Sequence, residues 1–128
     1  MSNLLAQGVA FLDAQRKAHM ASEVVYRRGA EDLAIAATVG VTRFEVEDES
    51  GFRSQVTARD YLVTAADMVL GGQAAEPAVG DTIRETIGSQ VFVHEVLPFG
   101  LEPAWRWSDP HRTTFRIHTK HTSTEAAP

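Results

Sequence analysis

The feature that most constrains this chain is a period-two alternation of apolar and polar residues, which recurs in short runs after Ser22. Successive side chains of a strand point to opposite faces, so this alternation indicates strands with one buried face. In the clearest run, residues 113–120, Phe115 and Ile117 face inward while Arg116, His118 and Lys120 face outward. The pattern predicts strands over residues 23–28, 33–39, 42–48, 52–58, 82–87, 90–97 and 113–120.

Turn residues separate these runs and predict hairpins. Ser50-Gly51 lies between two alternating runs, and Gly88-Ser89 lies between two more, as tight turns require. Gly40 is expected to interrupt the strand pattern between residues 39 and 42. Several short strands with regular turn signals favour a small antiparallel β-barrel or sandwich.

Helical periodicity is confined to the N-terminus. Apolar residues at helical spacing predict a helix over Ser2 to Met20, which packs either on its own barrel or on a neighbouring subunit. The fold class is therefore β-rich α+β. We divide the chain into an N-terminal helix (residues 1–21), a β-barrel domain (22–121) and a flexible tail (122–128).

Composition excludes several kinds of function. The 128 residues contain no cysteine, which rules out disulfides, thiolate nucleophiles and cysteine-based metal sites. The net charge is −5 and the basic residues are scattered, so sequence-specific binding of nucleic acid is disfavoured, whereas a surface that DNA merely passes fits. No apolar run reaches the roughly 20 residues that span a bilayer, and no signal peptide is visible, so we expect a cytoplasmic protein without a membrane partner.

Candidate catalytic groups are few. His111, His118 and His121 lie close in the sequence, but on a strand His118 and His121 face opposite sides, so we expect exposed, polar histidines and no metal. His19 and His94 have no evident partners. No serine lies in a nucleophile motif, and Gly71-Gly72 is not a phosphate loop. The sequence therefore predicts neither an enzyme nor a cofactor.

Two segments are candidates for protein contacts. Trp105 and Trp107 flank Arg106 on a predicted loop that continues to Arg112, and these residue types are enriched at interface hot spots. The alternative is that one or both tryptophans plug the end of the barrel. The second segment is the acidic hairpin tip of Glu47, Asp48 and Glu49, which we expect to be solvated.

The order of these parts resembles phage head–tail connector proteins of the head-closure type, also called stopper or head–tail joining proteins, including those of gene transfer agents. The resemblance rests on Pro77-x-x-Gly80-Asp81-x-Ile83, the hairpin that follows, the Trp105-Arg106-Trp107 segment and the terminal strand. It covers roughly residues 26–120.

This resemblance implies a β-barrel that assembles as a hexameric or dodecameric ring in the virion neck, after synthesis in the bacterial cytoplasm. The ring would sit below the portal or adaptor protein, retain packaged double-stranded DNA and dock the tail. Such proteins are not enzymes and need no cofactor.

Three alternatives remain open at this point. A tail-terminator or tail-completion protein shares the size and assembly logic of a stopper. A small β-barrel that recognises a protein through the Trp105–Trp107 segment would instead be a stable monomer or dimer. A metal hydrolase would have to use His111, His118 and His121.

Overall fold

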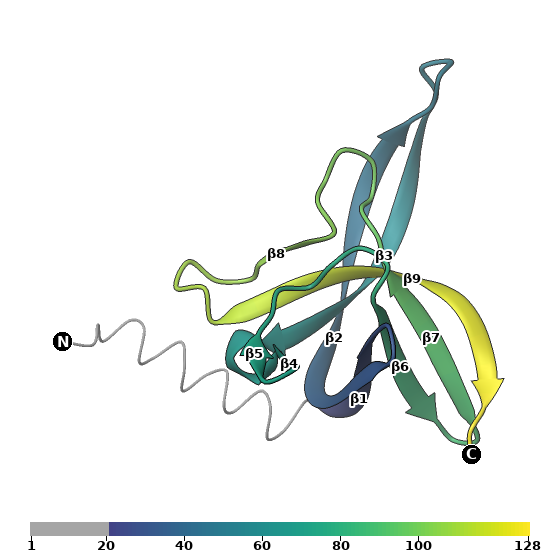
Figure 1. Cartoon of the computed structure of the whole chain (residues 1–128). Coiled ribbons are helices and arrows are strands. Elements are labelled where there is room, and N and C mark those ends of the chain that lie inside the picture. The colour runs from purple at the N-terminus through teal and green to yellow at the C-terminus, as the bar shows by residue number, and fades with distance from the viewer. Residues whose placement is uncertain (1–20) are drawn as a thin grey trace.

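The fold, seen in a computed structural model, is almost entirely antiparallel sheet, and the structure describes residues 21–128 (Figure 1). The helix predicted over Ser2 to Met20 lies outside the described residues. A single 3₁₀ turn, η1 (Ala65–Asp67), follows the third strand. The strands are β1 (Ser22–Arg28), β2 (Glu31–Glu47), β3 (Arg53–Thr64), β4 (Val69–Leu70), β5 (Gln73–Ala74), β6 (Thr82–Ile87), β7 (Gln90–Val96), β8 (Trp105–Trp107) and β9 (Thr114–Ala126).

Seven of these strands form one sheet in the order β3-β2-β1-β6-β7-β9-β8, and β3 also pairs with β9. Two long strands change partners along their length. β2 pairs first with β1 and then with β3, and β9 pairs with β3 and β8 before it pairs with β7. The sheet therefore curls around the core. The β-rich antiparallel architecture is confirmed, but the sheet does not form the uniform closed barrel that the sequence predicts. It is not a sandwich either, because the second sheet contains only β4 and β5.

The strand boundaries differ from the prediction in two places. Residues 33–48 were expected to form two strands with a break at Gly40, but β2 is continuous over 17 residues. Gly40 instead permits a close approach, because a Cβ at this position would lie 3.2 Å from a guanidinium nitrogen of Arg116. At the C-terminus β9 continues past the expected end at Lys120, and Ala126 pairs with Gln90.

Both predicted hairpins are present. The β6–β7 hairpin turns at Gly88-Ser89, and the β2–β3 hairpin turns over residues 48–52. Beyond residue 42, β2 pairs only with β3, and this part of the hairpin extends away from the rest of the sheet (Figure 1). We call residues 42–58 the arm.

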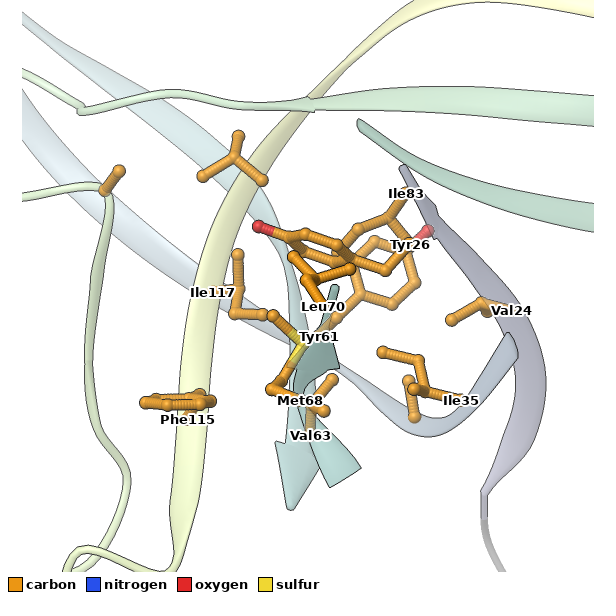
Figure 2. Packing of buried hydrophobic residues seen from close by; sticks show 13 residues of the cluster. Val24, Tyr26, Ile35, Tyr61, Val63, Met68, Leu70, Ile83, Phe115 and Ile117 are labelled. Atoms are coloured by element: carbon orange, nitrogen blue, oxygen red, sulfur yellow. The ribbon is translucent and has the colours of Figure 1, made fainter. Parts of the chain in front are cut away.

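The core lies on the concave face of the sheet and draws on most of its strands. Tyr26, Tyr61, Met68, Ile83 and Ile117 are its largest fully buried side chains of apolar or aromatic type, and they pack together in the centre (Figure 2). Their positions follow the period-two alternation of the strands, since Tyr61 and Val63, or Phe115 and Ile117, lie two residues apart. The alternation in the sequence thus marks the inner face of β9 as predicted.

Candidate interaction surfaces

The tryptophans lie on a strand and not on a loop as predicted. Trp105 and Trp107 are the two ends of β8, which pairs with β9 so that Trp105 lies opposite Ile117 and Trp107 opposite Phe115. Both indoles are half-buried and pack against the core. The ring of Phe115 contacts both, edge-on to Trp105 at 5.0 Å and stacked on Trp107 at 4.7 Å between centroids. The tryptophans therefore cover one end of the core, which was the alternative interpretation of this segment.

The face of β8 that points away from the core is exposed to solvent, and its edge away from β9 is unpaired among the described strands. Arg106 lies between the tryptophans, so its side chain points away from the core and is exposed. Two backbone hydrogen bonds flank β8, from His118 N to Ala104 O and from Ser108 N to Thr114 O. At the even-numbered positions of this segment, the backbone groups therefore point towards β9. The backbone groups of Trp105 and Trp107 therefore point away from β9, and no other described strand pairs with β8. Such an edge is a template for pairing with another chain.

The turn from β8 to β9 is organised by Asp109. Its carboxylate accepts hydrogen bonds from the backbone N–H groups of His111, Thr113 and Thr114, at 2.9–3.3 Å. Burial raises the pKa of Asp109, but these hydrogen bonds outweigh burial and the net pKa is lowered. In this turn Arg112 has a φ of 59°, the one positive value among the described non-glycine residues, and its side chain is exposed. Arg106 and Arg112 are thus both accessible from solvent.

The acidic residues lie at the end of the arm, as predicted. Glu47, Asp48 and Glu49 are exposed. Asp48 fixes the turn, because its Oδ1 accepts hydrogen bonds from Ser50 N (2.9 Å), Ser50 Oγ (2.7 Å) and Phe52 N (2.9 Å). Its pKa is lowered by these hydrogen bonds. Phe52, the first residue of the strand predicted over 52–58, lies instead in the turn and is 68% exposed.

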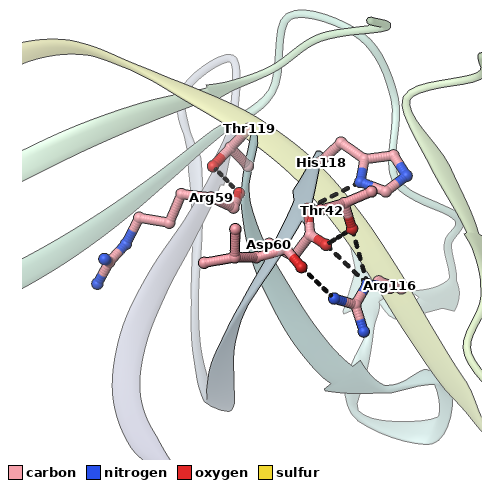
Figure 3. A network of polar contacts seen from close by, with 7 residues as sticks. Thr42, Arg59, Asp60, Arg116, His118 and Thr119 are labelled. Atoms are coloured by element: carbon pink, nitrogen blue, oxygen red, sulfur yellow. Dashed lines mark hydrogen bonds and ion pairs between the residues drawn. The ribbon is translucent and has the colours of Figure 1, made fainter. Parts of the chain in front are cut away.

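The base of the arm is held by a buried polar network that the sequence did not reveal (Figure 3). The fully buried carboxylate of Asp60 accepts hydrogen bonds from Thr42 Oγ1, from Arg116 Nε at 2.6 Å and from His118 Nδ1 at 2.8 Å. Arg116 also donates to Val41 O at 3.0 Å. Burial raises the pKa of Asp60, but the hydrogen bonds from His118, Thr42 and Arg116 outweigh burial and lower it overall. The network joins β2, β3 and β9 where the arm begins.

A groove separates the arm from the loop between β7 and β8. Phe44 of the arm stacks on Phe99 of this loop, with ring centroids 5.1 Å apart. Beyond this contact the groove opens to about 590 Å³. It is lined by Glu45, Val46, Glu47, Phe99, Gly100, Leu101 and Glu102. The apolar residues that line it are Val46, Phe99 and Leu101, and the charged residues that line it are all acidic.

The Pro77 to Ile83 motif fixes the start of β6. Gly80 has a φ of 94°, a conformation that favours glycine. The buried carboxylate of Asp81 accepts hydrogen bonds from Ala78 N (3.0 Å), the Tyr26 hydroxyl and Arg28 Nη2 (2.8 Å). Burial and the hydrogen bond to Asp81 raise the pKa of Tyr26. Asp81 therefore fixes the turn before β6 and also joins β1 to β6.

The histidines do not form one site. His118 is buried in the Asp60 network and is not exposed as expected, because the loop containing Phe99 covers the outer face of β9 there. His121 lies beside the buried His94 instead, with ring centroids 5.4 Å apart. Burial and the nearby charge of Arg59 lower the pKa of His94 to about 4. Within residues 21–128, no three metal-ligating side chains are placed to hold a metal ion together.

An open strand edge and a projecting hairpin are features of proteins that contact other proteins. The family model of the phage head-tail joining protein matches residues 2–126 of the chain. The match covers nearly the whole sequence, so the chain belongs to the phage head-tail joining protein family, as the resemblance indicates. It is therefore a component of the virion neck, in contact with other head and tail proteins.

No curated protein matches the chain. Among residues 21–128 there is no helix of the length and apolarity that crossing a membrane requires.

Proposed function

We propose that this chain is the stopper of a tailed phage or phage-like particle. Six or twelve copies form a ring below the portal or adaptor protein, retain the packaged DNA and offer the tail a docking surface. The chain acts in this role without a catalytic step and without a cofactor. Membership of the head-tail joining family supports the position in the neck.

The observation that carries the proposal is the arm with its acidic tip. The arm is a narrow hairpin that extends from the body of the sheet, so copies in a ring can direct their arms towards a common axis (Figure 1). Its tip carries Glu47, Asp48 and Glu49, all exposed. Carboxylates repel the phosphate backbone, so a plug of this composition blocks DNA by its bulk without binding it. A stopper needs this combination, because the DNA has to leave again.

The first test is the number of copies in particles. Nuclease-resistant particles are purified from the source cells, and quantitative mass spectrometry compares this chain with the major shell protein. Six or twelve copies per particle support the proposal. Absence from particles, with the protein abundant in the soluble fraction, contradicts it and favours an independent binding module.

A second test separates the stopper from the tail terminator. The arm tip, residues 47–52, is replaced by a two-residue Asn-Gly turn, with Ser89→Ala in the β6–β7 turn as the control. A stopper without its plug gives heads that lose DNA together with tails of normal length. Tails of irregular length with retained DNA would identify a tail terminator instead.

A further inference from the structure

The arm is incomplete as an isolated element. Over residues 42–47 and 53–58 its two strands pair only with each other, so both outer edges are free among the described strands. An isolated two-stranded hairpin is marginally stable in water. The arm packs on the rest of the chain through Phe44, which stacks on Phe99, and through Val46, which lies next to Gly100. A partner that pairs with its free edges would stabilise it further.

The groove beside the arm indicates the chemistry of that partner. Three of its lining residues are acidic, Glu45, Glu47 and Glu102, and no lysine or arginine lines it. Val46 and Phe99 add apolar lining, and Leu101, which also lines the groove, is fully exposed. The matching surface therefore presents guanidinium or ammonium groups next to apolar or aromatic area.

The chain itself carries such a surface at β8. Arg106 is exposed on the outer face, Arg112 is exposed in the following turn, and neither guanidinium forms an ion pair within residues 21–128. The half-buried indoles of Trp105 and Trp107 supply aromatic area beside them. The open backbone edge of β8 adds hydrogen-bonding groups.

We propose that the acidic groove of one copy binds the β8 surface of the next copy, with Glu45, Glu47 and Glu102 facing Arg106 and Arg112. This inference rests on the proposed ring and specifies its contact. The two surfaces differ, so the contact is head-to-tail, and a head-to-tail contact closes into a ring when its rotation permits. Trp105, Trp107 and Leu101 form the apolar centre of the interface, and the charges select the partner and its orientation.

The two surfaces do not meet within one chain. Arg106 lies opposite Arg116, Arg116 opposite Leu62 and Leu62 opposite Thr38, so three steps of about 5 Å each lead from β8 across the sheet to β2. Glu47 is nine residues further along β2, which is roughly 30 Å at about 3.3 Å per residue. A disulfide needs Cα atoms within about 7 Å, so cysteines at positions 47 and 106 can join only different copies.

The test uses the absence of native cysteine. The full chain with Glu47→Cys and Arg106→Cys is incorporated into particles, oxidised gently and separated without reducing agent. We expect a ladder of covalent oligomers up to the full ring, which collapses to one band on reduction. The control pairs Arg106→Cys with Glu23→Cys, an exposed residue of β1 outside the proposed interface. Each single-cysteine variant is expected to give no species above a dimer.

Each outcome decides between the two proposals. A ladder above the control level supports the head-to-tail contact. Several copies per particle with cross-linking at the control level overturn this contact and leave the ring intact. A disulfide from position 47 to a cysteine of another neck or tail protein overturns it too, because the groove then belongs to that partner. Absence of the unmodified chain from particles contradicts both the proposed function and this inference.

Discussion

The carboxylate of Asp60 and the guanidinium of Arg116 form an ion pair with Oδ2 and Nε 2.6 Å apart, at the point where the arm leaves the rest of the sheet. Asp60 is fully buried, and its remaining partners, Thr42 and His118, come from β2 and β9. The pair therefore couples the direction of the arm to the strand that carries the core residues Phe115 and Ile117. The arm is therefore held at its base by this network and, further along, by the stacking of Phe44 on Phe99.

We expect Asp60→Asn to lower the free energy of unfolding by about 3 kcal/mol, because it leaves Arg116 without its buried counter-charge. Urea denaturation at pH 7 measures the loss. The matched control is Asp32→Asn, which removes an equally short pair with Arg27 (2.6 Å) on the exposed surface and should have a much smaller effect. Equal effects of the two variants would show that the network does not stabilise the base of the arm.

The two kinds of residue on β8 should separate stability from assembly. Trp107→Ala removes an indole stacked on Phe115 and should cost about 3 kcal/mol of folding free energy. Arg106→Ala removes an exposed side chain and should leave the melting temperature within about 1 °C while reducing incorporation into particles. Thermal melts and copy counts in particles measure both. A Trp107→Ala variant as stable as the unmodified chain would show that this indole does not stabilise the core.

Charge reversal tests the pairing of the arm with β8 independently of cross-linking. Glu47→Arg and Arg106→Glu should each reduce incorporation into particles, since each places like charges in the proposed contact. The double variant restores an opposite pair and should recover much of the loss. Arg53→Glu, opposite Glu47 on the arm but outside the groove lining, is the control that changes arm charge alone. If the double variant loses as much incorporation into particles as the two single variants lose together, the two residues do not interact.

The sequence predicts local features of this fold well and contacts between distant strands poorly. The β6–β7 and β2–β3 hairpins follow from turn residues between alternating runs, and the inner face of β9 follows from Phe115 and Ile117. Residues 122–126 have no apolar alternation, and their strand conformation depends on pairing with β7. β8 has three residues, too few for a periodic signal, and it is a strand only because β9 lies beside it.

The candidate site shows the same division. The exposed position of the acidic tip could be predicted, because it lies at the turn between two alternating runs, whereas Arg106 was placed on a loop and lies on a strand. The Asp60 network could not, because its members come from three strands, and Thr42 and Arg116, for example, are 74 residues apart. One signal was present: Asp60 lies directly before the run Tyr61-Leu62-Val63, and aspartate is depleted inside strands unless a partner compensates it.

The buried His94 should make the stability of the chain depend on pH between about 4 and 6.5. Its folded-state pKa is about 4 against an ordinary value of 6.5, so the unfolded chain binds the proton more readily. The contribution of neutral His94 to the free energy of unfolding is therefore fully present above pH 6.5. It falls as the pH drops towards 4, by up to about 1.4 kcal/mol per pH unit. Asp60 and Glu85, whose pKa values are lowered from 3.8 and 4.5, lose their contribution as the pH falls through and below these values, at the acid end of this window and beyond it.

We therefore expect the free energy of unfolding at pH 5 to be about 2 kcal/mol lower than at pH 7.5, from urea titrations at both values. His94→Gln cannot take up the proton and should reduce this difference, whatever its effect on stability at pH 7.5. His121→Gln is the matched control, since His121 neighbours His94 but is exposed. Its pH dependence should stay close to that of the unmodified chain. If His94→Gln retains the full difference, another group is responsible for the acid sensitivity, and His94 accepts a proton in the folded state as easily as in the unfolded one.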